Sequence, residues 1–427
     1  MLPKAVTGRA SRCVRALAAV LGALTAFGIL ALSTGATASA HSPRAHADYA
    51  QQCGEPYSAQ RDPSNPLALS TPPGANPLTG ARFFVPGPAK GAAASAIAQL
   101  LGLDPQRLAL GESWASFAQQ IQSGPLAARL ATNPTLAHQV AELSKIARQP
   151  EAQRFSIYSQ GGGPGAIFNQ AQKIFCSNLT ADPGSIPIIN TYFLHPALGG
   201  CPTPGQVLAY GPTFRRRVDE MAAATGRRPA VYLLELDAIG SSSCIAQNHA
   251  LPQWEADLRY EMNTMEALPH TVVYVEGGYS DSNSVGYVAK VLNAIGVNRI
   301  RGFFTNDTHE NWTLSEVRYA TKLAKLTHGA HFIVNTAQNG HGPLLNPHPT
   351  IQGVEDLCNP PGRGLGIRDT TDTGYPFADA FMWTHPPGNS SGCGGGPPGG
   401  VFWTARAILL AQDANNQLGP GFPSSPY

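Results

Sequence analysis

The amino-acid sequence predicts an α/β fold, a distorted parallel (β/α) barrel. Short apolar segments alternate with helical patterns between about residues 186 and 387, and this alternation is typical of a parallel sheet with right-handed crossovers. Nearly every apolar segment ends in a polar residue and a Gly, Ser or Pro loop. A closed barrel collects such strand ends at one mouth, whereas an open doubly wound sheet has its site at a switch point. No G-x-G-x-x-G follows the first segment, which disfavours a nucleotide-binding fold.

Six segments have the length and composition of buried strands. They are IPIIN (186–190), AVYLLELD (230–237), TVVYVEGG (271–278), RIRGFFTN (299–306), HFIVNTA (331–337) and AFMWTHPP (380–387). Helical patterns such as TFRRRVDEMAAATG, SVGYVAKVLNAIG and SEVRYATKLAKLTHG lie between them. The sequence therefore predicts fewer than eight evident strands.

The first 40 residues have the features of a Sec-type signal peptide, cleaved near Ala40. A basic segment precedes an apolar run at 16–32 and the small residues ASA at 38–40. No later segment approaches about 18 unbroken apolar residues, so we expect a secreted protein with no membrane contact after cleavage. An extended leader at 41–75 and a single barrel domain at 76–427 follow, with a helical insertion at about 92–154.

Charge and cysteine content exclude several classes of protein. A formal net charge of +2 with only 13% charged residues provides no footprint for a nucleic acid, and a neutral polymer or small polar substrate fits better. Six of the seven cysteines lie after the signal peptide, which predicts three disulfides with fifteen possible pairings. Without C-x-x-C or a helical His pair, we expect no metal site. We also expect no cofactor, and a monomer.

The segment PAVYLLELDAIG (229–240) places two carboxylates at the end of a predicted strand. Glu235 and Asp237 would point to the same side of an extended chain, because side chains alternate with a period of two. Paired carboxylates at a strand end form a candidate acid/base site. In the alternative interpretation, they only cap a loop.

Seven segments, in order along the chain, resemble glycoside hydrolase family 6, the cellobiohydrolases and endoglucanases. They are NPLTGARFFV (76–85), LLELDAI (233–239), YVEGGYSD (274–281), RGFFTNDTHENW (301–312), VNTAQNGHGP (334–343), LCNPPGRGLG (357–366) and DAFMWTHPPGNSSGC (379–393). The chain is thus similar to a divergent bacterial member with altered active-site residues. This resemblance implies a seven-stranded barrel, and disulfides Cys201–Cys244, Cys358–Cys393 and Cys53–Cys176.

The resemblance also implies hydrolysis of β-1,4-glucosidic bonds with inversion, on a polysaccharide or oligosaccharide. Asp237 matches the general acid, Glu276 matches another strand-end aspartate, and Glu235 could supply a neighbouring negative charge. A general acid must hold its proton near neutral pH, which burial or such a charge promotes. The remaining candidates contact the sugar through rings or hydrogen bonds: Tyr192, Asn306, Trp312, Asn335, Gln338, Trp383 and His385.

Two family carboxylates are replaced, by Gly200 and Ser391, and nearby cations are replaced by Gln338 and His385. The joint change leaves no uncompensated charge, so it indicates a remodelled site. We expect an active glycosidase with Asp237 as acid, assisted by Glu276 or by water held by Asn335, Gln338 and His385. The alternative is a catalytically impaired glycan-binding protein on the same barrel. A secreted esterase would need G-x-S-x-G, which the sequence lacks.

Overall fold

A computed structural model describes residues 75–156, 163–346 and 355–420. The predicted signal peptide, the leader up to residue 74 and Cys53 lie outside the described residues. Among the described residues, no helix is both long and apolar enough to cross a membrane.

The central element is a sheet of seven parallel strands in the order β1-β2-β3-β4-β5-β6-β7. The strands are β1 (Gln153–Ser156), β2 (Ile188–Tyr192), β3 (Ala230–Leu234), β4 (Thr271–Glu276), β5 (Gly302–Thr305), β6 (His331–Asn335) and β7 (Ala378–Met382). Within the described residues no ladder joins β7 to β1, so the barrel is open there. The predicted distorted parallel α/β barrel is confirmed.

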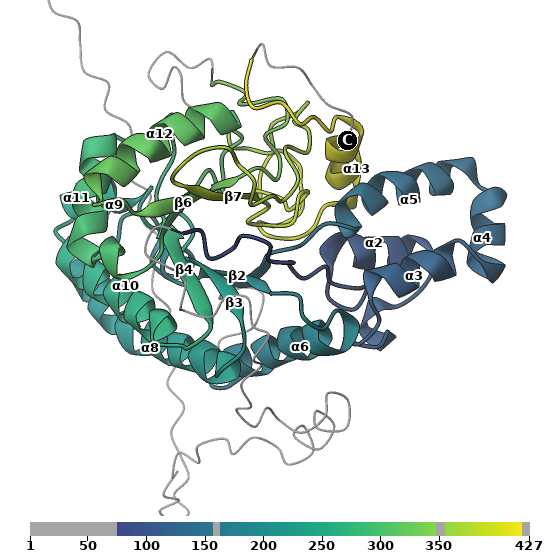
Figure 1. Ribbon diagram of the computed structural model, residues 1–427, viewed down its shortest axis with the longest axis horizontal. Coiled ribbons are helices and arrows are strands. Elements are labelled where there is room, and N and C mark those ends of the chain that lie inside the picture. The colour runs from purple at the N-terminus through teal and green to yellow at the C-terminus, as the bar shows by residue number, and fades with distance from the viewer. Residues whose placement is uncertain (1–74, 157–162, 347–354, 421–427) are drawn as a thin grey trace, which may run out of the picture. The chain divides into compact units, whose positions relative to one another are not determined.

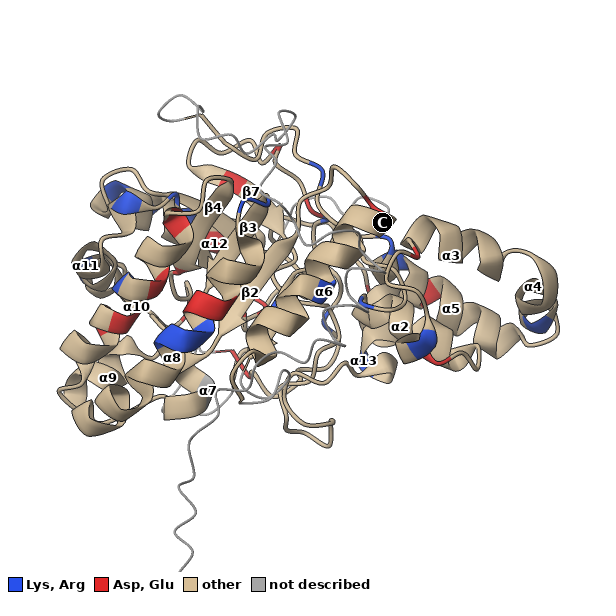
Figure 2. Ribbon diagram, turned by 90° about the horizontal axis from the view of Figure 1, so that it is seen from below, with Lys and Arg blue, Asp and Glu red and all other residues tan. Residues whose placement is uncertain are grey.

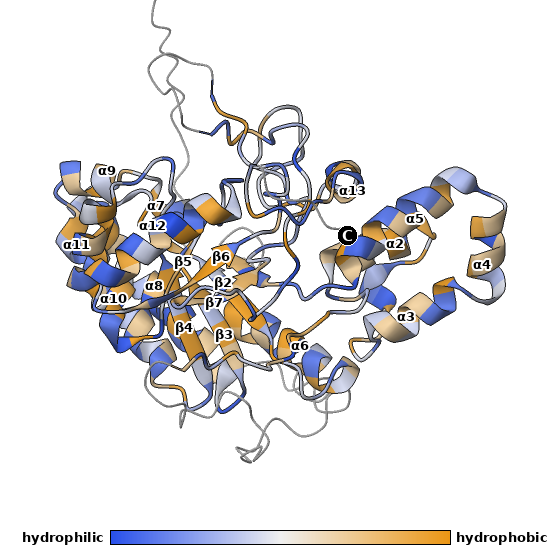
Figure 3. Ribbon diagram, turned by 45° about the horizontal axis from the view of Figure 1, so that its top comes forward, coloured by the Kyte–Doolittle hydropathy of each residue, from blue (hydrophilic) through white to orange (hydrophobic). Residues whose placement is uncertain are grey.

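Alternation along the strands builds two separate cores. On β3, Val231 and Leu233 belong to the apolar interior of the barrel, whereas Tyr232 and Leu234 pack in the layer between the sheet and the helices. Every residue of β3 and β4 is buried, which explains why these strands are continuous apolar runs. Figure 3 shows the strands as predominantly apolar and the helices as mixed.

Helices surround the sheet, and Figure 1 shows α6, α8, α10, α11 and α12 in an arc around it. The helices after β1 are α6 (Ala166–Ala181), α7 (Leu194–Leu198), α8 (Pro204–Thr225), α9 (Ser242–Gln247), α10 (Leu251–Glu266), α11 (Val285–Ile295), α12 (Thr313–Leu326) and α13 (Thr404–Gln412), with the short 3-10 helix η2 (Val297–Arg299). A capping box of Thr203 and Gln206 begins α8. Figure 2 shows residues of both charge signs distributed over the helices.

The segment before β1 is helical, as the sequence predicts. It comprises α2 (Ala92–Leu100), η1 (Pro105–Arg107), α3 (Trp114–Ile121), α4 (Gly124–Ala131) and α5 (Pro134–Ala147). Its apolar faces pack with one another and with α13 and Trp383 in a core of their own. Figure 1 shows these helices to one side of the sheet, next to α13.

The structure adds one strand and moves several predicted strand ends; for example, the strand predicted at 380–387 is β7, Ala378–Met382. All six predicted strands are present, but β1, with the sequence QRFS, is additional. It has too few apolar residues to give a strand pattern. The strand predicted at 230–237 ends at Leu234, because the backbones of Glu235 and Asp237 are left-handed, with φ of 54° and 59°.

Two of the three predicted disulfides are confirmed. Cys201 is bonded to Cys244 with a Cα–Cα distance of 5.1 Å, and Cys358 to Cys393 at 5.6 Å. The prediction for Cys53 falls outside the described residues.

Candidate active site

Asp237 is presented at the carboxyl end of β3 by a turn, and hydroxyl groups hold its carboxylate. Tyr279 donates to Oδ1 at 2.6 Å, Thr308 donates to Oδ1 at 2.9 Å, and Tyr192 donates to Oδ2 at 3.3 Å. These hydroxyls come from the loops after β4 and β5 and from the end of β2. Asp237 itself is only partly buried. Its φ of 59° is rare for a non-glycine residue, and such backbone strain is concentrated at functional sites.

Glu276, at the end of β4, holds the loop that carries Asp237. It is fully buried and accepts the backbone N–H of Ile239 at 2.6 Å and of Gly240 at 3.0 Å, together with that of Gly278. Burial, followed by the negative charge of Asp237, raises the pKa of Glu276 to about 8 against the effect of these three donors. Glu276 is thus a buried proton-holding neighbour of Asp237.

Glu235 lies in the interior and binds backbone groups. It is fully buried and accepts the N–H of Phe193 at 3.0 Å and of Leu194 at 2.7 Å, which follow β2. Its own N–H donates to Thr191 Oγ1 at 3.0 Å. The expectation that Glu235 and Asp237 lie along one face of an extended strand was wrong, because both residues have a left-handed backbone. Glu235 caps a neighbouring loop, as in the alternative interpretation.

Asn306 and Asn335 connect the ends of β5 and β6. Asn306 Nδ2 donates to the Asn335 carbonyl at 3.0 Å, and Asn335 Nδ2 donates to the Asn306 carbonyl at 2.8 Å. Asn335 Oδ1 also accepts the N–H of Thr384 at 3.2 Å, after β7. Both asparagines are buried, so the described contacts fix the loops of the barrel mouth.

Asp307, which sequence reasoning missed, is the carboxylate at the β5 end. It is fully buried, and its Oδ2 lies 2.7 Å from Arg154 Nη2 on β1. Thr384 Oγ1 donates to Oδ1, and His385 Nδ1 lies 3.8 Å from Oδ1. Although burial opposes it, the Arg154 guanidinium holds the pKa of Asp307 below its ordinary value. The only sequence signal was its position directly after Asn306, at a strand end.

His385 and Gln338 extend this network at the β6 and β7 ends. Gln338 Nε2 lies 2.8 Å from His385 Nε2, and both side chains are buried. Burial lowers the pKa of His385, although the negative charge of Asp307 opposes this shift. A neutral imidazole therefore occupies this position at neutral pH.

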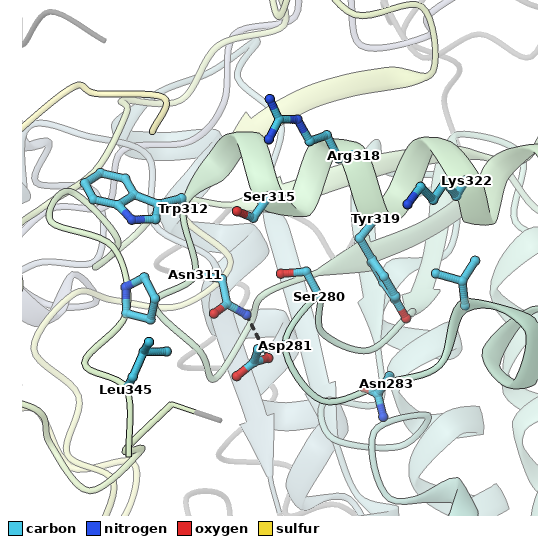
Figure 4. Close-up of a pocket in the computed structure, with 12 residues that line it drawn as sticks. Ser280, Asp281, Asn283, Asn311, Trp312, Ser315, Arg318, Tyr319, Lys322 and Leu345 are labelled. Carbon is cyan, nitrogen blue, oxygen red and sulfur yellow. Dashed lines mark hydrogen bonds between the residues drawn. The ribbon is translucent and has the colours of Figure 1, made fainter. Parts of the chain in front are cut away.

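The three predicted aromatic residues have different environments. Tyr192 contacts Asp237 as described. Trp383 is 1% exposed, donates from Nε1 to the Ile367 carbonyl at 3.0 Å and belongs to the core with the helical insertion. Trp312 is partly buried and lines a pocket of about 420 Å³ over the ends of β4 and β5, as Figure 4 shows.

The two positions where the family carboxylates are replaced differ in their surroundings. A Cβ atom on Gly200 would lie 3.5 Å from His195 Cε1 and 3.8 Å from Ser241 Oγ, which is ordinary contact. His195, a second group missed by sequence reasoning, stacks on Tyr192 with ring centroids 5.9 Å apart. Ser391 is exposed. The arrangement can therefore present the Asp237 carboxyl to a substrate, while neutral groups occupy the two altered positions.

Comparison with known protein families matches residues 210–414 to the family described as "Glycosyl hydrolases family 6". The chain is 28% identical over 289 residues to Endoglucanase A of Thermobispora bispora, covering 67% of this chain and 59% of that protein. It is 29% identical over 276 residues to Endoglucanase 1 of Streptomyces sp. (strain KSM-9), covering 62% of this chain and 70% of that protein. The chain thus spans less than two thirds of the length of the first of these relatives.

The fold is similar to that of the endoglucanase Cel6 from Mycobacterium tuberculosis, solved in complex with methyl-cellobiosyl-4-deoxy-4-thio-beta-D-cellobioside. The TM-score is 0.61 at 28% identity, over 79% of this chain and 99% of that chain. The matched family segment contains the strand that leads to Asp237 and the strands that carry Glu276 and Asp307. These matches and the seven-stranded barrel support a member of glycoside hydrolase family 6.

Proposed function

We propose that this protein is an extracellular glycosidase that hydrolyses a β-1,4-linked, cellulose-like glucan, with Asp237 as the proton donor. The names of the similar proteins support the substrate class, since the two relatives are endoglucanases. The similar Mycobacterium tuberculosis enzyme was solved with a thio-linked cellobioside. The N-terminal sequence supports secretion. The proposed partner is a polysaccharide or oligosaccharide, and the protein acts as a monomer.

The geometry of Asp237 is the observation that carries this proposal. Two hydroxyl donors, Tyr279 and Thr308, bind Oδ1, whereas Oδ2 has one longer contact to Tyr192. Oδ2 is therefore the oxygen with more freedom to carry a proton toward a substrate. A protonated Oδ2 donates to the glycosidic oxygen as the bond to the anomeric carbon breaks. Glu276 keeps the Asp237 loop in place by accepting the backbone N–H groups of Ile239 and Gly240.

Inversion requires a water molecule on the opposite face of the sugar, activated by a base about 6.5–9.5 Å from the acid. Gly200 and Ser391 supply no carboxylate for this role, and Asp307 is held in an ion pair with Arg154. We expect neutral groups to orient the water, and slower turnover than with a carboxylate base. The same observation favours a second candidate, a glycan-binding protein with little or no hydrolysis.

The test is release of reducing ends from carboxymethyl cellulose, lichenan, xylan and chitosan. We expect the wild-type protein to act on a β-glucan, and Asp237→Asn to lower the rate by about 10²–10⁴-fold. Asp372→Asn, at an exposed loop position, is the matched control and should keep the wild-type rate. Glycan binding without any release of reducing ends would instead identify the binding protein. Full activity of Asp237→Asn would exclude Asp237 as the acid.

A further inference from the structure

A cluster of potential metal ligands lies next to the proposed acid but is not part of it. Asp281 follows β4, His309 follows β5, and Glu355 lies between β6 and β7. One ligand atom of each residue lies within 4.8 Å of those of the other two. His309 is 6% exposed and Glu355 is 2% exposed. We propose that these three side chains bind a divalent transition-metal ion that connects the three loops.

The charge around His309 is the first argument. Besides Asp281 and Glu355, the carboxyl group of Glu316 acts on His309, and that of Glu310 acts on Glu355; Glu310 and Glu316 are both buried. The cations near Glu310 are Arg406, whose Nη2 lies 3.5 Å from Glu310 Oε1, and Arg363. Buried carboxylates that exceed their counter-charges are costly. A dication would balance this excess.

Glu355 supplies a second, independent argument. Its Oε2 accepts the backbone N–H of Glu310 at 2.5 Å, but its Oε1 is buried and has no hydrogen-bond partner among the described residues. A buried carboxylate oxygen without a hydrogen-bond donor is costly, and buried charged groups are normally paired or bind metal ions. A metal ion next to Glu355 would supply this missing partner.

The other two ligands are oriented by neighbouring groups. Asp281 Oδ1 accepts Asn311 Nδ2 at 2.8 Å, the contact drawn in Figure 4, and Oδ2 accepts the N–H of Glu355 at 3.1 Å. His309 Nδ1 is 2.9 Å from Asp281 Oδ1, and its ring stacks on Tyr279 with centroids 3.8 Å apart. Such surrounding contacts orient metal ligands in other proteins. An ion between His309 and Asp281 takes the place of the proton in their hydrogen bond.

The ligand set selects the class of ion. One imidazole nitrogen with two carboxylate oxygens suits Zn²⁺ or Mn²⁺, whereas Ca²⁺ and Mg²⁺ prefer oxygen ligands alone. Sequence reasoning led to the opposite expectation because the three ligands are on separate loops, with no local spacing to recognise. The ion would fix His309 against Tyr279, whose hydroxyl binds Asp237, and so stabilise the loops beside the acid. This inference does not depend on the proposed glycosidase activity.

The test is calorimetric titration of ZnCl₂ into the mature chain, made without a histidine tag and freed of metal with EDTA. We expect one high-affinity zinc per chain, and affinity that rises with pH as protons are released. Glu355→Gln and His309→Phe should each weaken binding by about tenfold or more; Phe retains a ring to stack on Tyr279. The matched control is His331→Gln, because His331 also pairs with an aspartate, Asp379, at 3.0 Å, but Arg301 balances that charge.

Two results would overturn the proposal. The first is a wild-type chain that binds no zinc at unit stoichiometry, and the second is unchanged zinc binding by both ligand variants. Circular dichroism checks that the variants fold. If the variants do not fold, zinc-edge X-ray absorption of the wild-type complex identifies the zinc ligands directly. One imidazole with oxygen ligands supports the site, whereas no imidazole, several imidazoles or sulfur would contradict it.

Discussion

The two halves of the barrel mouth use their carboxylates differently. At the β2–β4 ends, Asp237 is partly exposed and held by hydroxyl groups. At the β5–β7 ends, Asp307 is fully buried and paired with Arg154. A carboxylate bound to a guanidinium remains ionised and cannot act as a proton donor, whereas one among hydroxyls keeps that capacity. The environment of each carboxylate, not its place at a strand end, therefore distinguishes the proposed proton donor from the buried, supporting carboxylate.

Removing Arg154, the cation paired with Asp307 at the β5–β7 ends, should have a large effect on stability. Arg154→Met leaves the Asp307 charge buried without its partner, and we expect a loss of about 3–5 kcal/mol in the free energy of unfolding. Urea denaturation measures it. The control is Arg107→Met on η1, which removes an exposed pair with Asp104 and should cost less than about 1 kcal/mol. Equal losses in the two variants would contradict the supporting role of the Arg154–Asp307 pair.

Glu276, the buried acid that binds the Asp237 loop, should make stability depend on pH. The pKa of Glu276 is raised from 4.5 to about 8, so the folded chain holds this proton where the unfolded chain has lost it. This group's contribution to the free energy of unfolding then falls as pH rises from about 4.5 to about 8. Glu276→Gln removes that contribution. Urea denaturation at pH 5 and at pH 8 measures the free energy of unfolding. Between these pH values it should fall less for the variant than for the wild type. An identical fall in both proteins would contradict the raised pKa of Glu276.

The hydroxyl groups around Asp237 should contribute unequally to kcat/KM. Tyr279→Phe removes the 2.6 Å bond to Oδ1 and Tyr192→Phe the 3.3 Å contact to Oδ2. A hydrogen bond to a charged group is worth about 1.5–3 kcal/mol, and an ordinary one about 0.5–1.5 kcal/mol. We expect kcat/KM on the active glucan to fall more for Tyr279→Phe than for Tyr192→Phe. The reverse order would place the reacting oxygen at Oδ1.

Restoring carboxylates at the altered positions should produce the smallest change, and a gain. A Cβ atom added to Gly200 would make only ordinary contacts, and Ser391 is exposed, so both positions should accept Asp. We expect the double variant Gly200→Asp/Ser391→Asp to raise kcat by about tenfold, because a positioned base contributes up to about 10²–10⁴-fold. Gly200→Asp alone is the control. An unchanged kcat in the double variant would mean that the base side does not limit turnover.

Sequence reasoning predicted the parts of the molecule that depend on local pattern. The apolar runs of β3 and β4 could be read directly because both are buried along their whole length. The sign of the backbone φ angle could not be predicted from the sequence. Glu235 was therefore expected to lie along the same face as Asp237, although both residues have a positive φ. The partner of Asp307 could not be read either, because Arg154 is 153 residues away on a strand without an apolar pattern.

The most direct test of Asp237 as proton donor compares two substrates that differ only in their leaving group. Asp237→Asn should lose about 10²–10⁴-fold in rate on an unactivated cello-oligosaccharide. It should lose far less on a cellobioside with a dinitrophenyl leaving group, because that group departs without a proton. Wild-type kinetics on both substrates give the reference. An equal loss on the two substrates would contradict the assignment, since it would show that Asp237 supports binding or structure instead of donating the proton.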